Sequence, residues 1–177
     1  MIEVVEVISG GNFIILILLV MVLCLILGLG LPTTANYLVV ASLMANVIVE
    51  IGGASGIVLP IIAVHLFVFY FGLMADVTPP VGLAAYAASA ISRADPIKTG
   101  IQAFYYEIRT AILPLVFIFN PELLLIGVSS LSHGVLIFVV SLIAILTFTS
   151  ATQGWFITKL KWYETILLLL ITLSMFR

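Results

Sequence analysis

The chain has 177 residues, of which 64% are hydrophobic and only 8% are charged, and its formal net charge is −2. A mean hydropathy of +1.39 excludes an ordinary water-soluble domain, because such a domain needs a charged surface. The sequence has no basic patch with which to bind nucleic acid. Its single cysteine, Cys24, excludes a disulfide framework and a cysteine-ligated metal site.

Long runs without Asp, Glu, Lys or Arg set the class of the protein. They cover Val7–Val49, Ile51–Ala75, Val77–Ser92 and Leu123–Thr158. Since about 20 helical residues cross the hydrocarbon layer of a bilayer, these runs predict an all-α polytopic membrane protein. The last apolar run, Thr165–Phe176, is too short to cross. We therefore expect the chain to be a fragment of a longer protein, with its last helix truncated.

The first predicted elements are two apolar helices separated by a polar, helix-breaking insertion. The first helix covers Phe13–Leu31 and the second Ala35–Val49, and the insertion is Leu31–Asn36. We expect the chain to be uncoiled at Pro32–Thr34, because proline interrupts a helix. Span parity allows a re-entrant hairpin, which enters from outside and turns at mid-depth, and the acidic N-terminus without Lys or Arg favours it.

A second interruption follows after a glycine-rich turn, which is predicted over Gly52–Gly56 and is not expected to be regular helix. The apolar run Ile57–Ala75 then meets the break Asp76–Gly82, which contains two consecutive prolines. Helix resumes over Leu83–Ser92, which at about 15 Å is too short to span alone. We therefore interpret Ile57–Ser92 as one discontinuous crossing.

Asp95 and Pro96 predict the next helix start, with Asp as the N-cap and Pro at the first helical position. We expect this helix to lie in the membrane interface and to continue into a span that ends near Phe119. The remaining predicted elements are a break at Asn120–Glu122, a polar turn at Ser129–Gly134, a crossing over Val135–Thr149 and an interface at Lys159–Tyr163.

The basic residues predict the orientation of the spans. The positive-inside rule places Lys and Arg on the cytoplasmic side. The two basic clusters are separated by two crossings and so share that side, which leaves the glycine-rich turn outside. Trp155, Trp162 and Tyr163 lie beside the second cluster and fit an aromatic belt. The clusters are Arg93, Lys98 and Arg109, and then Lys159 and Lys161.

The two breaks carry the residues best suited to bind an ion or a substrate. Freed backbone groups cost several kcal/mol each in hydrocarbon, so they persist only where protein or a water-filled cavity satisfies them. Thr hydroxyls and unwound carbonyls are oxygen ligands for hard cations, and amide ends of helices favour anions. Paired broken helices are typical of secondary transporters. The candidate binding residues are Gly30, Pro32, Thr33, Thr34, Ala35, Asn36, Asp76, Thr78, Pro79, Val81 and Gly82.

Three alternatives stay open from the residues alone. Both breaks could be kinks without function, as in a passive scaffold subunit. Asp76 could be a deep functional acid, at a cost of roughly 2.5–3.5 kcal/mol, or a cap in a wet vestibule. Finally, Gly53–Gly56 matches the short G-x-S-G pattern of rhomboid intramembrane proteases, with Ser55 as nucleophile. Against this, we expect His65 to be a packed or cavity-lining residue and His133 to be interfacial.

Three motifs in these regions resemble the large membrane subunit of tripartite ATP-independent periplasmic (TRAP) transporters. They are Gly28–Ala35, Gly72–Leu83 and Ala94–Gly100, and the resemblance covers about Ile14 to Ile126. The tail, including Lys161–Arg177, resembles the extended C-terminus of fused permeases, in which the small and large subunits form one chain. Such permeases often pair with TAXI-type solute-binding proteins.

The resemblance implies a sodium-coupled elevator mechanism, in which re-entrant hairpins and broken helices form a mobile transport domain. Leu31–Asn36 would be the tip of the second hairpin and Thr78–Gly82 the unwound part of the second broken helix, with Thr34 and Thr78 as sodium ligands. Residues 1–128 would be the second-repeat transport region, and residues 129–177 would be additional C-terminal transmembrane helices. Since the first repeat is absent from the sequence, we do not expect this fragment to transport alone.

The resemblance also implies partners and a location. The protein would be a non-enzymatic symport permease in a bacterial or archaeal inner membrane, with sodium as coupling ion and no other cofactor. Its substrate would be an organic acid, a C4-dicarboxylate or a related carboxylate, delivered by a periplasmic solute-binding protein. Further partners would be the lipid bilayer and the rest of the permease, including the small-subunit helices.

Overall fold

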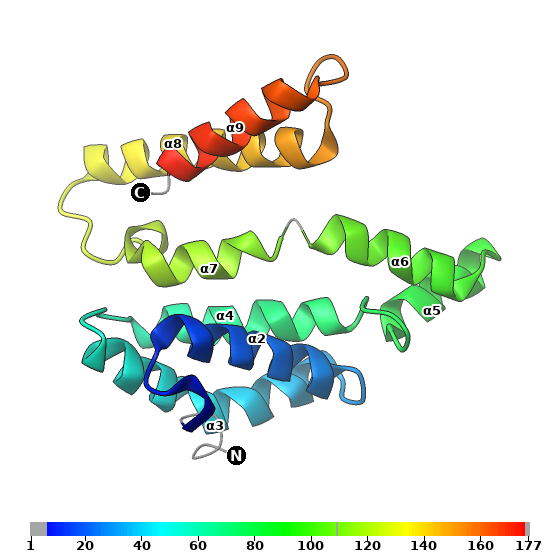
Figure 1. The fold of residues 1–177 in the computed structure, drawn as a ribbon, viewed down its shortest axis with the longest axis horizontal. Helices are drawn as coiled ribbons and strands as arrows, with labels where there is room; N and C mark the ends of the chain where they lie inside the picture. The colour runs from blue at the N-terminus through cyan, green and yellow to red at the C-terminus, as the bar shows by residue number, and fades with distance from the viewer. Residues whose placement is uncertain (1–6, 109, 176–177) are drawn as a thin grey trace. The chain divides into compact units, whose positions relative to one another are not determined.

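The computed structural model describes residues 7–108 and 110–175, which form helices joined by short connections (Figure 1). These residues contain no strand. Three candidate spans are long and apolar enough to cross a membrane: Thr33–Ala54, Pro96–Phe119, which holds two shorter helices, and Leu131–Gln153. The prediction of an all-α polytopic membrane protein is therefore confirmed. The chain divides into two compact units, Met1–Ile118 and Phe119–Arg177, which are described separately.

The centre of the first unit is a bundle of three helices, α2 (Phe13–Gly28), α3 (Thr33–Ala54) and α4 (Ile61–Ala75), each packed on the other two (Figure 1). Asn12 caps α2 by accepting hydrogen bonds from two backbone N–H groups. The interior is filled by large apolar side chains, and in a bilayer such packing acts through close contact between helices. The fully buried ones include Leu16, Val20, Val40, Met44, Ile48, Val64, Phe67, Val68 and Phe71.

The first break is shorter than the sequence predicted and lies earlier. Helix α2 ends at Gly28 and α3 begins at Thr33, so the uncoiled residues are 29–32. The prediction that Thr33 and Thr34 are uncoiled is wrong, since both belong to the first turn of α3. The reason is that Pro32 precedes the helix with φ −58° and ψ 150°, and the missing proline N–H removes no helical hydrogen bond at that position.

The predicted turn at Gly52–Gly56 is also wrong in part, because α3 continues through Gly52 and Gly53 to Ala54. Glycine within a helix costs only about 1 kcal/mol relative to alanine, so tertiary packing can override it. Here Gly52 is buried, and a Cβ at this position would overlap the Leu59 side chain. The second arm of the hairpin is therefore long enough to cross the membrane, and its re-entrant depth stays a prediction.

The second break matches its prediction, because α4 ends at Ala75 and helix resumes as α5 (Leu83–Ser92). Next come α6 (Pro96–Glu107), which packs on α5, and α7 (Ile112–Phe119). The predicted start of α6 is confirmed, since the Asp95 side chain accepts a hydrogen bond from the Lys98 N–H at 2.8 Å. Gly100 of α6 is buried beside Val77 and Pro79 of the break, which places α6 against it.

The second unit contains a short 3₁₀ turn, η1 (Pro121–Leu124), followed by an antiparallel helical hairpin of α8 (Leu131–Gln153) and α9 (Trp162–Met175) (Figure 1). The break at Asn120–Glu122 is confirmed as the end of α7. The polar turn predicted over Ser129–Gly134 is shorter, because Ser130 caps α8 by accepting from the His133 N–H. His133 and Gly134 therefore lie in the first helical turn rather than before it.

Candidate functional site

The two breaks meet in the first unit. The Thr33 hydroxyl at the start of α3 donates a hydrogen bond to Oδ2 of Asp76 at the end of α4, although the two residues are 43 positions apart. A glycine permits close packing here, because Gly28 lies directly against the Ala75 methyl group; Gly72 is buried nearby, beside the Thr33 carbonyl. The junction therefore joins the hairpin tip to the broken helix.

Asn36 is fully buried at this junction and only half satisfied. Its Nδ2 donates to the Cys24 carbonyl of α2 at 2.9 Å. Its Oδ1 has no hydrogen-bond partner and is the one such buried side-chain atom in the described part of the chain. An unpaired buried acceptor costs about 1–3 kcal/mol. A bound cation would remove that cost.

The hairpin tip adds unpaired backbone groups of both signs. Within the residues that the structure describes, the carbonyl oxygens of Leu29, Gly30 and Leu31 accept no backbone hydrogen bond. In the same part of the chain, the N–H groups of the first three residues of α3, Thr33–Ala35, have no acceptor and no side-chain cap. Carbonyls favour a cation, and free N–H groups at a helix N-terminus favour an anion.

The second break is folded back on itself. The Thr78 hydroxyl donates to the Met74 carbonyl at 2.7 Å, and the backbone oxygens of Thr78 and Asp76 accept from the N–H groups of Gly82 and Ala84 at 3.1 Å each. A side chain at Gly82 would be crowded here, because a Cβ would lie 3.2 Å from the Val77 backbone. The Thr78 proton is thus engaged, while its oxygen keeps acceptor capacity.

The remaining predicted residues have different surroundings. Gly30, Pro32 and Val81 are exposed, whereas Ala35 and Pro79 are half-buried. The Pro79–Pro80 peptide bond is cis. None of these five residues takes part in the Thr33–Asp76 hydrogen bond or the Asn36 contact.

Thr34 lies at a separate cavity between α3 and α4 with a volume of about 320 Å³. There Tyr37 Oη and His65 Nδ1 are 2.9 Å apart, so His65 lines a cavity as predicted. Tyr37 is a polar lining residue that the sequence reasoning missed. A signal for it existed, since Tyr37 follows the Thr33–Asn36 cluster by one position. The cavity residues are Thr34, Tyr37, Ile62, His65, Leu66 and Phe69.

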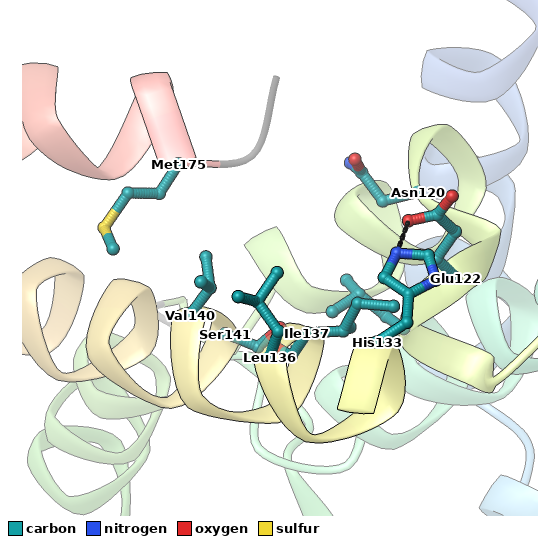
Figure 2. Close-up of a pocket in the computed structure, with 9 residues that line it drawn as sticks. Asn120, Glu122, His133, Leu136, Ile137, Val140, Ser141 and Met175 are labelled. Atoms are coloured by element: carbon teal, nitrogen blue, oxygen red, sulfur yellow. Dashed lines mark hydrogen bonds and ion pairs between the residues drawn. The ribbon is translucent and has the colours of Figure 1, made fainter. Parts of the chain in front are cut away.

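The second unit has a pocket of about 190 Å³ near the start of α8 (Figure 2). Figure 2 shows His133 directed toward Glu122, with 3.9 Å between His133 Nε2 and Glu122 Oε2. The two side chains form an ion pair only when His133 carries a proton, and a solvent-accessible pair of this length is worth about 0–1 kcal/mol. The pocket contains none of the predicted binding residues.

A protease site at Ser55 is not supported. Ser55 is the exposed residue that ends α3, and the nearby histidine His65 interacts with Tyr37 instead. The described residues also contain no group of three or more His, Cys, Asp or Glu side chains that could hold a metal ion. The atoms at the junction that could coordinate a cation are therefore mainly neutral oxygens, and the Asp76 carboxylate is the charged group among them.

Comparison with known proteins identifies the family of the chain. Residues 2–131 match the family described as "Tripartite ATP-independent periplasmic transporter, DctM component", and residues 134–177 match a domain of unknown function, DUF3394. No curated protein and no solved structure matches the chain. Because the first match covers most of the sequence and includes both breaks, the chain belongs to the DctM family of TRAP transporter permeases.

Proposed function

We propose that the junction of the two breaks is part of a sodium site, and that this TRAP permease takes up an organic acid together with sodium. The observation that carries the proposal is the buried, unpaired Oδ1 of Asn36, and the unpaired carbonyls of residues 29–31, in the connection just before α3, add further oxygens. Sodium is a hard cation with a single charge, so neutral oxygens and one carboxylate suit it. A divalent ion would favour more carboxylates than Asp76 alone provides.

The hairpin tip also supports an anionic substrate. The unpaired N–H groups of Thr33–Ala35 form the positive end of α3. A carboxylate binds at such a helix end through backbone hydrogen bonds and the helix dipole. Cation and carboxylate would then occupy neighbouring positions and stabilise each other electrostatically, which is a physical basis for symport. A C4-dicarboxylate or a related carboxylate fits this chemistry.

Family membership implies a periplasmic binding protein and other permease subunits as partners. We propose that the binding protein is of the TAXI type and that the membrane is the inner membrane of a bacterium or archaeon. We also propose that residues 1–128 move as part of an elevator-type transport region, with 129–177 as additional helices.

The test is sodium-dependent uptake by the complete transporter in proteoliposomes, with its binding protein supplied outside. Asn36→Leu removes Oδ1, and Thr78→Val and Thr34→Val remove the two hydroxyls. Each lost ligand is expected to raise the sodium concentration for half-maximal uptake by about tenfold, equivalent to about 1.4 kcal/mol. Thr147→Val in α8 is the matched control, since it removes a hydroxyl from the second unit.

The outcomes separate the parts of this proposal. Unchanged sodium dependence in Asn36→Leu and Thr78→Val, with normal insertion of both variants, would contradict the sodium site. A change in Thr78→Val but not in Thr34→Val would restrict the site to the junction and exclude the cavity beside Tyr37. A sodium gradient without any effect on the intact transporter would reject sodium coupling itself.

A further inference from the structure

The connection between α8 and α9 exposes large apolar side chains in close succession. We call Gly154–Tyr163 the aromatic loop. Its Ile157 and Trp162 side chains are each 77% exposed, and Trp155, Phe156 and Tyr163 are exposed as well. A patch of this kind on a protein surface marks contact with a partner or with a membrane.

The aromatic loop has a defined backbone structure. Trp155 and Lys159 form an isolated antiparallel bridge, the Phe156 N–H donates to the Thr158 carbonyl at 3.1 Å, and the Leu160 N–H donates to the Gly154 carbonyl at 2.8 Å. Gly154 has φ 67°, a left-handed conformation that ends α8. Because these N–H groups are paired internally, the loop can lie in a partly dehydrated interface.

The loop also carries two exposed lysines, Lys159 and Lys161. No carboxylate among the described residues lies within ion-pair distance of either ammonium group. The nearest acid in sequence, Glu164, accepts a hydrogen bond from the Lys161 backbone N–H at 2.7 Å and so caps α9. Lys161 Nζ lies 5.7 Å from the centre of the Tyr163 ring. Both ammonium groups thus remain available to an anion.

We propose that the aromatic loop is a binding site for anionic phospholipids. Its position supports this partner, because the loop joins α9 to α8, which is long and apolar enough to cross the membrane. Trp and Tyr rings favour the headgroup region, where an apolar body and a polar tip are both satisfied. Lys159 and Lys161 would bind the phosphate and acidic headgroups, and Phe156 and Ile157 would enter the acyl boundary.

The chain contains a direct reporter of this site. Trp155 and Trp162 are its only tryptophans, and both belong to the aromatic loop. The 177-residue chain would be reconstituted in two sets of phosphatidylcholine vesicles. One set contains a small fraction of brominated phosphatidylglycerol, and the other contains the same fraction of brominated phosphatidylcholine. Bromine quenches tryptophan fluorescence only at short range, so quenching measures the local concentration of each lipid.

Brominated phosphatidylglycerol is expected to be enriched about tenfold at the loop relative to brominated phosphatidylcholine at low salt, and less at high salt. Lys159→Gln with Lys161→Gln should abolish the enrichment. It should also leave quenching by brominated phosphatidylcholine intact, which shows that the variant still holds its loop at the bilayer. Lys98→Gln, which removes an exposed lysine from α6, is the matched control and should keep the enrichment.

Three results would overturn the proposal. Equal quenching of the intact chain by the two brominated lipids would exclude a preference for anionic lipid. Absence of quenching by either lipid would show that the loop does not contact the bilayer. Enrichment that persists in the double lysine variant would assign the anionic preference to other residues. The test does not involve sodium or substrate, so it is independent of the proposed transport function.

Discussion

Threonine hydroxyls cross a helix interface in both units, and the two interfaces differ in what surrounds them. In the α8–α9 hairpin, the Oγ1 atoms of Thr147 and Thr172 are 3.0 Å apart. Each hydroxyl also lies within hydrogen-bonding distance of a carbonyl of its own helix. At the junction of the two breaks, Thr33 in the first turn of α3 instead donates to the Asp76 carboxylate at the end of α4, and the buried Asn36, three residues further along α3, keeps an oxygen without a partner.

This difference shows that the residue type alone does not make a binding site in a membrane protein. A hydroxyl on a continuous helix can donate a hydrogen bond to a carbonyl of its own helix, so its contact with a neighbouring helix adds little stability. Uncoiled backbone leaves oxygens without partners, and these can be satisfied by an ion or a substrate. Four predictions test the contrast between the junction and the hairpin.

The largest effect is expected from Gly28→Ala at the junction. The added methyl would overlap the Ala75 side chain and lie 2.6 Å from Asn36 Nδ2; because the Ala75 Cβ is fixed to its backbone, a helix would have to shift. Overpacking costs about 1–3 kcal/mol and occasionally more, and an overlap this deep should cost about 3 kcal/mol or more, which should lower the thermal unfolding temperature of the purified protein.

Gly72→Ala is the matched control for that substitution. Its Cβ would meet only ordinary contacts, at 3.6 Å from Asn36 Nδ2 and 4.0 Å from the Thr33 carbonyl. Unfolding temperatures that fall equally in both variants would show that the close approach at Gly28 is not what limits the junction.

The second effect concerns the pair Thr33 and Asp76. A double-mutant cycle with Thr33→Val and Asp76→Ala should give a coupling free energy of unfolding of about 1.5–3 kcal/mol, as for a hydrogen bond to a charged group. Thermal unfolding of the four proteins in detergent measures it. Additive losses from the two substitutions would mean that the contact contributes no specific stabilisation.

A smaller coupling is expected for Thr147 and Thr172 in the hairpin. Since both hydroxyls have carbonyl partners in their own helices, a cycle with Thr147→Val and Thr172→Val should give about 0.6 kcal/mol. The same unfolding measurement applies. A coupling as large as that of Thr33 with Asp76 would remove the distinction between the two interfaces.

The smallest effect is expected from Gly30→Ala at the hairpin tip. A Cβ at Gly30 would have no heavy atom within 4 Å, and the substitution keeps the backbone carbonyl. Stability should therefore change by less than about 0.5 kcal/mol, and sodium-dependent uptake by the complete transporter should be unchanged. A strong loss of uptake would reveal that the tip requires a bare glycine on its exposed side.

Local chemistry explains which elements could be predicted. The break at Asp76–Gly82 and the helix start at Asp95 follow from proline and capping residues, which act on the backbone within a few positions. The extent of α3 could not be predicted in this way. Gly52 and Gly53 favour a turn locally. The helix nevertheless continues to Ala54, with the Leu59 side chain packed against Gly52.

The candidate site, too, could be predicted from the sequence only in part. Thr33, Asn36 and Asp76 were all named from their positions near the breaks, because polar residues are costly within apolar spans. The sequence could not show that Asn36 keeps one oxygen unpaired, or that Thr34 faces a separate cavity beside Tyr37. Both facts depend on the orientation of α3 about its own axis where it packs against α2 and α4.

The amino-acid sequence by itself determined the class of this protein, its two breaks and its resemblance to TRAP permeases, because hydropathy, proline and glycine act locally along the chain. Only the tertiary structure decided which oxygens of the breaks meet. The hydrogen bond from Thr33 to Asp76 joins residues far apart in sequence, and it lies where Gly28 of α2 allows close approach to Ala75 of α4 and Asn36 of α3.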